Sequence, residues 1–466
     1  MRTPPALAGG THGADALRPL LETVLTALAA GAAARPGPLP AGGPAHTAAT
    51  VRAAVGDLLP DKGDPQALAT ITRALAEGSA DPAHPHCAAH LHCPPLAVAT
   101  AADLAASALN PSMDSWDQAP AASVVEHLLT RTLAAEVYPA THPDAPADAL
   151  VTTGGTESNQ LAALLARERR HPRIVHGANT HHSVPRAAWL LGLPAPVAVP
   201  TPTGTLDPAA LHDALTALHG EPALVVATAG TTDAGLIDPL PAIADICAAH
   251  HARLHVDAAY GGGLLLSNTP ARRALLDGLD RAHTVTLDLH KLGWQPVAAG
   301  LLAVRDPADL TALHQQADYL NADDDTEAGL PDLLGRSLRT SRRPDALKAA
   351  VTLKTLGRHQ LGELVDTVCA SASVLADLVE AHPRFALHRR PTLSTVLFRP
   401  LDPDGAPLTD DDLAAVRRTL LHQGRAVLGR ARADGRRWLK ATLLNPRTTP
   451  GDLAALLALV EGTTPR

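Results

Sequence analysis

Strand-like and helix-like segments alternate along the middle of this chain, and this alternation constrains the fold more than any other feature. Short runs rich in valine, leucine and alanine predict strands over 147–153, 173–177, 195–200, 223–229, 253–260, 284–290 and 297–304. Segments with an apolar face predict helices over 159–170, 183–193 and 238–251. Strands and helices that alternate at this spacing predict an α/β fold with a largely parallel sheet covered on both faces. Ligands of such sheets bind at the carboxyl ends of the strands.

Different patterns flank this middle region. Helical patterns and loops rich in proline and glycine precede it, and long helices with a few short strands follow it. A chain of 466 residues is long enough for two or three structural units. We therefore expect an N-terminal helical segment over 1–98, a large domain over 99–360 and a small C-terminal α+β domain over 361–466.

Charge and composition argue against several kinds of partner. The net charge is −8 and no basic run is present, so nucleic acid is not an expected partner. The N-terminus makes a poor signal peptide, and no window of about 18 uninterrupted apolar residues predicts a membrane span. The four cysteines form no CxxC pair. They are typical of reduced thiols, so we expect a cytoplasmic protein.

Glycines and a threonine lie between the first predicted strand of the middle region and the helix that follows it. Gly154, Gly155 and Thr156 there bring backbone N–H groups and a hydroxyl to a helix N-terminus. Such a turn is suited to binding phosphate. The alternative is a tight turn that uses glycine only for its backbone conformation.

Two charged residues end later strands of the same region. Asp257 follows an apolar strand, and a buried carboxylate needs a cationic or N–H partner. Lys291 is one of five lysines and ends the run VTLDLHK. A lysine amine can become neutral and nucleophilic when it is buried, which arginine cannot. The alternatives are a helix cap or structural ion pair for Asp257 and a solvated loop residue for Lys291. Together with the phosphate turn, Asp257 and Lys291 indicate a ligand that has a phosphate, a cationic ring nitrogen and an aldehyde.

Pyridoxal 5′-phosphate (PLP) has these three groups, and the chain resembles the fold-type I PLP-dependent decarboxylases of group II. The resemblance extends from Asp81 to Leu361. It is carried in order by NPSMDSWDQAPAASVVE, TTGGTESNQLAALL, THHSVPRAA, ATAGTTDAGLID, HVDAAYGGG, DLHK and TSRRPDALK. It implies a mostly parallel seven-stranded sheet flanked by helices, and decarboxylation of an L-amino acid to a primary amine and CO₂. It also implies a homodimer with the active site near the subunit interface.

The resemblance implies roles for eight residues at the cofactor. They are Lys291 for the Schiff base, Asp257 for the pyridine nitrogen, Ala259 and His181 for the two ring faces, Gly155 and Thr156 for the phosphate, Thr232 for the ring hydroxyl, and His290 beside the lysine. Catalytic roles are expected for Lys291, His181 and His290.

The segment HPHCAAHLHC, over 84–93, has the composition of a metal site, because it contains four histidines and two cysteines. Its spacing fits no standard zinc pattern, in which ligands usually come as two separated pairs, so we expect no metal. The resemblance implies that His90 and Leu91 instead line the substrate pocket.

One expected catalytic feature is missing from the sequence. Decarboxylases of this family often have a loop tyrosine that protonates the substrate carbon, but the corresponding region over 321–337 contains no tyrosine. Tyr319 lies just upstream of it. The resemblance therefore leaves His181 and His290 as candidate proton donors.

The substrate is expected to be a small diamino acid. The motifs HLHCPP, ADYLN and TSRR are most similar to the diaminobutyrate branch of the family, so L-2,4-diaminobutyrate is the first expectation. Aromatic, acidic and aliphatic amino acids stay open as substrates. A decarboxylation-dependent oxidase that gives an aldehyde, and a non-catalytic binding protein on the same fold, are the remaining alternatives.

Overall fold

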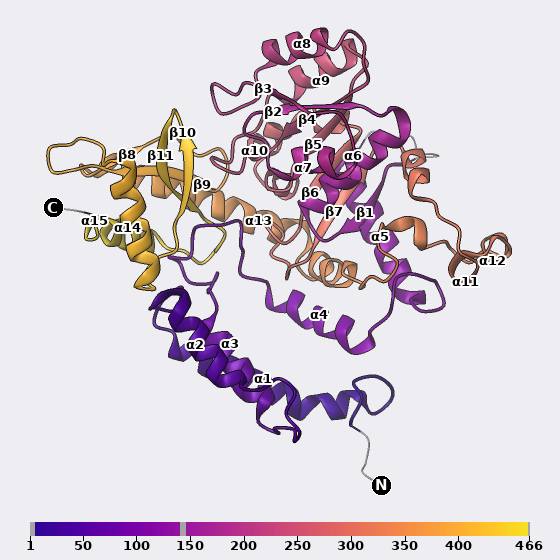
Figure 1. Cartoon of the computed structure of the whole chain (residues 1–466), viewed down its shortest axis with the longest axis horizontal. Coiled ribbons are helices and arrows are strands. Elements are labelled where there is room, and N and C mark those ends of the chain that lie inside the picture. The colour runs from indigo at the N-terminus through magenta and orange to yellow at the C-terminus, as the bar shows by residue number, and fades with distance from the viewer. Residues whose placement is uncertain (1–4, 140–145, 465–466) are drawn as a thin grey trace. The chain divides into compact units, whose positions relative to one another are not determined.

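The computed structural model describes residues 5–139 and 146–464 (Figure 1). Its internal contacts divide the chain into two compact units, a large one over 95–369 and a small one that combines 1–94 with 370–466. The N-terminal and C-terminal segments, which the sequence analysis treats as separate domains, thus share one compact unit.

A seven-stranded sheet forms the centre of the large unit, in the spatial order β1-β7-β6-β5-β4-β2-β3. The strands are β1 (Asp148–Thr152), β2 (Arg173–Gly177), β3 (Val197–Val199), β4 (Ala223–Thr228), β5 (Arg253–Asp257), β6 (Thr284–Asp288) and β7 (Gly300–Val304). Strands β3, β2, β4, β5 and β6 pair in parallel, whereas β7 is antiparallel to both β6 and β1. The prediction of a mostly parallel seven-stranded sheet is confirmed.

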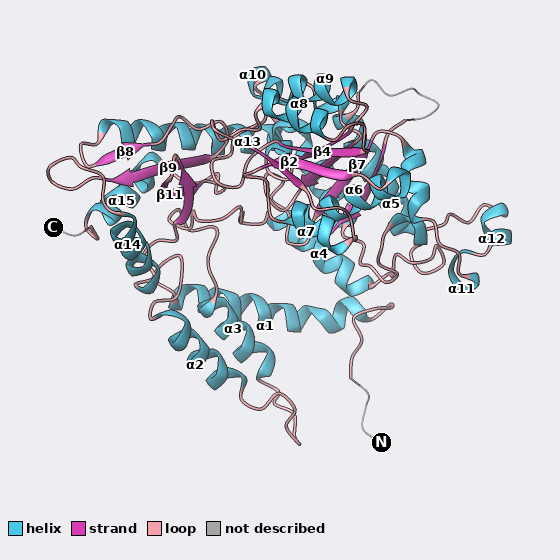
Figure 2. Ribbon diagram, turned by 45° about the horizontal axis from the view of Figure 1, so that its top comes forward, coloured by secondary structure: helices cyan, strands magenta, loops and turns pink. Residues whose placement is uncertain are grey.

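Helices cover both faces of this sheet, as parallel strands require. The helices of the large unit include α4 (Ala97–Leu109), α5 (Pro120–Val137), α6 (Gly155–Arg170), α7 (Ser183–Leu190), α8 (Pro208–Ala217), α9 (Leu240–Ala249) and the short α10 (Pro270–Arg273), α11 (Asp318–Asn321) and α12 (Asp323–Glu327). Of these, α5 to α9 contact the strands of the sheet. Figure 2 shows α8 and α9 on one side of the strands and α6 and α7 on the other. On the α6 and α7 side, alanine and valine side chains pack closely against Ile174 of β2 and Leu224 of β4.

The small unit has its own core around a four-stranded sheet in the order β10-β11-β9-β8. Its elements are α1 (Gly13–Ala34), α2 (Gly43–Val55), α3 (Ala67–Gly78), β8 (Phe385–Leu387), β9 (Thr395–Pro400), α14 (Asp410–His422), β10 (Gly429–Ala433), β11 (Arg436–Thr442) and α15 (Pro450–Glu461). All neighbouring strands of this sheet are antiparallel. The element α13 (Ala346–Ala381) is kinked at Gly357, whose φ of 65° is not helical, and it begins in the large unit and ends in the small one.

Helix α1 is, among the described residues, the one helix long and apolar enough to cross a membrane by length and composition. Its best 18-residue window has a mean hydropathy of 1.3, although Asp15, Arg18 and Glu22 interrupt the helix and no continuous apolar run exists. Core helices of soluble proteins and signal sequences have the same properties. The helix therefore does not by itself identify a membrane partner.

Candidate active site

The carboxyl edge of the sheet brings several predicted site residues together. Strands β5 and β6 pair in parallel and end at Asp257 and Asp288, so Lys291 follows at the same edge. Strand β1 is antiparallel to β7, which is antiparallel to β6. The turn after β1, with Gly154 and Gly155, therefore also lies at this edge.

The glycine turn leaves no room for larger residues. Gly154 has a φ of 148°, and a Cβ placed on it would lie 2.9 Å from Cε1 of His290. A Cβ on Gly155 would lie 3.1 Å from the Cβ of Ala259 and 3.3 Å from Oδ2 of Asp288. The turn before α6 is thus in direct proximity to the segments that carry Asp257 and Lys291.

Asp257 is buried, and both of its carboxylate oxygens accept hydrogen bonds. Oδ2 lies 2.8 Å from Nδ2 of Asn159, and Oδ1 lies 3.1 Å from the backbone nitrogen of Ala259. These two donors compensate the burial of the carboxylate and fix its plane. The sequence predicted the position of Asp257, whereas Asn159 in the helix after the glycine turn was not recognised.

Lys291 pairs with a carboxylate that the sequence analysis missed. Its Nζ lies 2.8 Å from Oδ2 of Asp288, whose side chain is only 2% exposed. Among the described residues, no donor reaches Oδ1 of Asp288. The signal was present in DLHK, because an aspartate three residues before a lysine in a tight turn can reach its amine.

A tight turn after β6 holds the backbone at Lys291. The backbone N–H of Lys291 donates to the Asp288 carbonyl at 3.2 Å, and the N–H of Trp294 donates to the Lys291 carbonyl at 3.3 Å. Trp294 is almost fully buried and its carbonyl accepts from Leu96 at 2.9 Å. The GWQP sequence after Lys291 therefore anchors the turn that presents the amine.

His181 lies in the electrostatic field of the same charged residues. Burial lowers the pKa of His181, and the negative charge of Asp257 partly opposes this effect. Lys291 lowers it further. Nδ1 of His181 lies 2.8 Å from the hydroxyl of Ser183. Its ring contacts that of His182, with a centroid distance of 4.1 Å.

The His290 ring approaches the same carboxylate oxygen of Asp288 as the amine of Lys291 does. Its Nδ1 lies 3.0 Å from the carbonyl oxygen of Ala299 and 3.3 Å from the backbone nitrogen of the same residue. Nε2 lies 3.6 Å from Oδ2 of Asp288. Burial lowers the pKa of His290, while the Asp288 carboxylate acts in the opposite direction. His290 thus has one ring nitrogen committed to the backbone and the other directed toward a carboxylate.

Three other predicted site residues lie in separate segments of the chain. Thr232 is exposed in the turn after β4. His90 and Leu91 belong to the small unit, where the backbone of the 84–93 segment hydrogen-bonds to Val427 and Thr442. Within the described ranges, no group of three or more histidine, cysteine, aspartate or glutamate residues is arranged to hold a metal ion.

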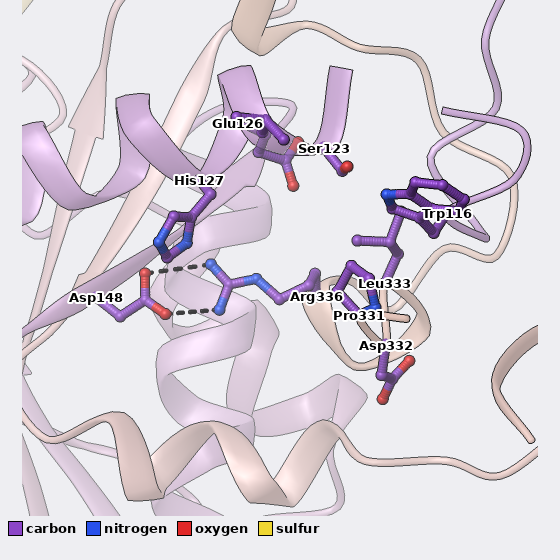
Figure 3. Close-up of a pocket in the computed structure, with 10 residues that line it drawn as sticks. Trp116, Ser123, Glu126, His127, Asp148, Pro331, Asp332, Leu333 and Arg336 are labelled. Carbon is purple, nitrogen blue, oxygen red and sulfur yellow. Dashed lines mark hydrogen bonds and ion pairs between the residues drawn. The ribbon is translucent and has the colours of Figure 1, made fainter. Parts of the chain in front are cut away.

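A pocket of about 460 Å³ in the large unit is lined by none of the predicted site residues (Figure 3). It is formed by Trp116, by residues of α5 and β1, and by the segment 331–336. In its wall, Nη1 and Nη2 of Arg336 lie 2.7 and 3.2 Å from the two carboxylate oxygens of Asp148. This ion pair fixes Arg336, which lies in the region over 321–337 that corresponds to the tyrosine-bearing loop of related decarboxylases.

Comparison with known proteins identifies the family. Residues 50–400 match the model of the pyridoxal-dependent decarboxylase conserved domain. The chain belongs to the pyridoxal-dependent decarboxylase family. Its PLP dependence and its activity as an amino acid carboxy-lyase, both predicted from the motifs, are therefore confirmed.

Relatives of this decarboxylase match most of its length. It is 41% identical to an L-2,4-diaminobutyrate decarboxylase of Rhizobium meliloti (strain 1021), covering 87% of this chain and 84% of that protein. It is 35% identical to the enzyme of the same name from Acinetobacter baumannii, covering 81% and 79%. A solved structure from Vibrio parahaemolyticus is similar, with a TM-score of 0.86, 31% identity and coverage of 98% and 97%. That structure is described as the glutamate decarboxylase domain of diaminobutyrate-pyruvate transaminase and L-2,4-diaminobutyrate decarboxylase.

The carboxyl edge of the decarboxylase sheet fits PLP chemically. The turn at Gly154 and Gly155 is a cradle that a Cβ would fill, and it opens at the N-terminus of α6, where N–H groups favour a phosphate. The amine of Lys291 and the carboxylate of Asp257 supply the groups that an aldehyde and a ring nitrogen require. The fit rests on these features of the described residues.

Proposed function

We propose that this decarboxylase acts on L-2,4-diaminobutyrate and releases CO₂ and the corresponding primary diamine. The observation that carries the proposal is the 41% identity, over 87% of the chain, to an L-2,4-diaminobutyrate decarboxylase. The motifs HLHCPP, ADYLN and TSRR support the same substrate. Acidic, aromatic and aliphatic amino acids are the alternatives.

We also propose the roles of the residues that hold the cofactor. Lys291 would bind its aldehyde, Asp257 its ring nitrogen, and Gly155 and Thr156 its phosphate. His181 and Ala259 would lie against the ring faces, with Thr232 at the ring hydroxyl, His290 beside the lysine, and His90 and Leu91 at the substrate. The Lys291–Asp288 pair and the glycine cradle support this assignment.

The chain's own residues would contribute orientation and charge to the reaction. Bound PLP supplies an electron sink for the bond between the substrate Cα and its carboxylate. The negative charge of Asp257 would favour a protonated ring nitrogen. His181 and Lys291 are both only partly exposed, which would limit water at the reacting carbon. His181 or His290 would then hold the proton that replaces the carboxylate.

A substrate panel tests the proposed reaction. The PLP-loaded protein is incubated with single L-amino acids, and the amine is identified by mass spectrometry together with released CO₂. L-2,4-Diaminobutyrate is expected to give the highest kcat/KM. A higher value for glutamate, an aromatic or an aliphatic amino acid would contradict the substrate proposal.

Decarboxylation-dependent oxidation is a second candidate reaction, because the segment over 321–337 contains no tyrosine. That reaction consumes O₂ and water, and it converts the amino acid to an aldehyde, CO₂, ammonia and hydrogen peroxide, with O₂ as the two-electron oxidant. The same assays distinguish the two, since a stoichiometric amine excludes the oxidase and a stoichiometric aldehyde excludes the simple decarboxylase.

Loss of Lys291 tests the site. Lys291→Ala is expected to abolish covalent retention of PLP and to reduce activity by more than about a thousandfold, because the covalent step loses its nucleophile. Lys354→Ala, at an exposed lysine of the same unit, is the control and should behave like the wild type. Normal turnover by Lys291→Ala would refute the assignment.

We propose that the enzyme is a cytoplasmic homodimer whose N-terminal helices contribute to the subunit contact. Leu20, Leu25 and Leu28 of α1 are 48%, 60% and 43% exposed, and an exposed apolar helix face favours association. Leu25→Glu combined with Leu28→Glu should convert the dimer to a monomer in light scattering. An unchanged dimer, or flotation of the wild type with lipid vesicles, would contradict this proposal.

A further inference from the structure

A row of buried polar side chains is connected to Asp257 by hydrogen bonds. Asn159 of α6, Ser183 of α7, His255 of β5 and Thr286 of β6 are each at most 3% exposed. None of them was recognised in the sequence. Buried polar groups are costly unless they are hydrogen-bonded, so the direction of each hydrogen bond in this row is constrained.

The carboxylate of Asp257 fixes the orientation of the Asn159 amide. A carboxylate oxygen can only accept, so the atom of Asn159 that lies 2.8 Å from Oδ2 of Asp257 must be the Nδ2 donor. The amide oxygen Oδ1 then faces the opposite direction. There it accepts from the hydroxyl of Thr286 at 2.9 Å and lies 2.9 Å from Nε2 of His255.

His255 is consistent with this orientation. Its Nε2 must donate to the Asn159 oxygen, so its Nδ1 is the acceptor in the neutral ring. The Thr284 hydroxyl lies 2.9 Å from Nδ1, closer than the Thr284 carbonyl at 3.2 Å, and can donate to it. Burial lowers the pKa of His255 to about 4, so the ring is neutral near pH 7.

The second N–H of Asn159 directs the hydroxyl of Ser183. Nδ2 of Asn159 lies 2.9 Å from Oγ of Ser183 and donates to it. The proton of the Ser183 hydroxyl is therefore available for Nδ1 of His181, at 2.8 Å. The backbone N–H of Ser183 also points at this nitrogen, at 3.3 Å. Two donors thus converge on Nδ1 of His181.

We infer that Asn159 and Ser183 are positioning residues that link Asp257 to His181 and hold His181 as the neutral tautomer with its proton on Nε2. The inference rests on the proposed function, in which Asp257 and His181 serve the same cofactor. Protonation of Nδ1 would oppose the fixed backbone N–H of Ser183 and would remove the acceptor of the Ser183 hydroxyl. His181 therefore presents Nε2–H as a hydrogen-bond donor and adds no positive charge beside the ring.

The direction of the His181 pKa agrees with a neutral ring. The titratable groups that act on it are Asp257, His182, Lys291 and Asp288, two of them carboxylates that favour a charged ring. The pKa of His181 is nevertheless lowered, with burial as the largest cause. The hydrogen bonds that Ser183 donates to Nδ1 stabilise the same neutral form.

Neutron diffraction of the cofactor-loaded enzyme tests the tautomer directly. The expected nuclear density places a single deuterium on Nε2 of His181 and another on the Ser183 hydroxyl, directed at Nδ1. A deuterium on Nδ1 of His181 would overturn the inference.

Variants test the function of the link in solution. Ser183→Ala removes the hydroxyl donor, so the acid limb of the kcat pH profile should move to higher pH and kcat should fall about tenfold, with little change in KM. Asn159→Ala removes the N–H that directs the Ser183 hydroxyl toward His181. It should therefore shift the pH profile and lower kcat in the same way. Ser183→Thr keeps the hydroxyl and should restore most of kcat and the wild-type pH profile.

Ser123→Ala is the matched control, because Ser123 is a buried serine of the same unit whose hydroxyl donates to the Pro120 carbonyl at 2.8 Å. Its pH profile should match the wild type. An unchanged pH profile in Ser183→Ala would contradict the inference.

A separate measurement distinguishes failure of the inference from failure of the proposed function. Borohydride reduction and peptide mass spectrometry report whether PLP is attached to Lys291 in the wild type and in each variant. If the wild type carries no PLP on Lys291, the proposed function fails. If the cofactor is attached and the Ser183 variants leave the pH profile and the tautomer unchanged, only the inference fails.

Discussion

At the scale of single residues, the pair of Asp288 and Lys291 decides how the amine is presented. Nζ lies 2.8 Å from a carboxylate oxygen that is almost fully buried. Charge-assisted hydrogen bonds of this kind are stronger than neutral ones and restrict the side chain to one direction. The ion pair therefore holds the flexible lysine near the glycine cradle before the cofactor arrives.

Replacing Asp288 should slow cofactor attachment. Asp288→Ala removes the ion-pair partner of Lys291, so PLP should be incorporated about tenfold more slowly, in line with the loss of one charge-assisted hydrogen bond. Stopped-flow absorbance of the apo-enzyme mixed with PLP measures the rate. Asp288→Asn keeps the shape and removes the charge. Incorporation by both variants at the wild-type rate would contradict the expected role.

The glycine turn gives a second prediction at this scale. Gly154→Ala should weaken PLP binding at least tenfold, because the new Cβ would lie 2.9 Å from the His290 ring at a φ of 148°. Gly329→Ala is the control for backbone strain alone, since Gly329 has a φ of 96° with no atom within 4 Å. Equilibrium PLP titration should show weaker binding only for Gly154→Ala. Equal affinities would exclude a steric role for this turn.

At the scale of elements, a buried ion pair joins α5 to the segment after η5 (Leu334–Arg336). Nη1 of Arg342 lies 2.6 Å from Oε2 of Glu126, and the two side chains are 1% and 5% exposed. Removing one member of such a pair leaves an unpaired charge in the protein interior. The contact therefore fixes helix α5 against a distant part of the large unit.

This buried ion pair should contribute more to the free energy of unfolding than exposed ion pairs do. Glu126→Ala is expected to lower the free energy of unfolding by about 3 kcal/mol, because Arg342 stays buried without its partner. Glu221→Ala removes the partner of Arg173 in a pair whose glutamate is 55% exposed, and it should cost less than about 1 kcal/mol. Urea unfolding of both variants measures the difference, and equal losses would contradict the prediction.

At the scale of the whole molecule, buried histidines make stability depend on pH. Burial lowers the pKa of His255 and of His283 to about 4, from an ordinary value of 6.5. Between these values the unfolded chain binds protons that the folded protein does not bind. The free energy of unfolding must therefore fall as the pH decreases through this window, with the loss complete below about pH 4.

The size of this effect can be measured. His255 alone should remove about 2 kcal/mol from the free energy of unfolding when the pH decreases from about 8 to about 5. Urea unfolding at both pH values should show a smaller decrease for His255→Gln than for the wild type. The prediction would be wrong if the two proteins lost the same stability.

The order of strands and helices in the large unit was predictable because each element depends mainly on the residues of its own short segment. Apolar runs such as 223–229 and 253–260 specify buried strands wherever they are placed, and the structure has β4 and β5 there. By contrast, the bounds of the helices before the middle region were not predicted, and α2 and α3 are separated where Gly56, Pro60 and Pro65 oppose a continuous helix.

The sequence by itself determined the strand and helix alternation, the glycine turn, and the strand-end positions of Asp257 and Lys291, because spacing and residue type express these features. Only the tertiary structure decided which side chains meet. Asp288 faces Lys291 because of the turn after β6, and Asn159 reaches Asp257 across 98 positions of the sequence. Such pairings depend on strand order and helix packing, which bring together residues that no local pattern connects.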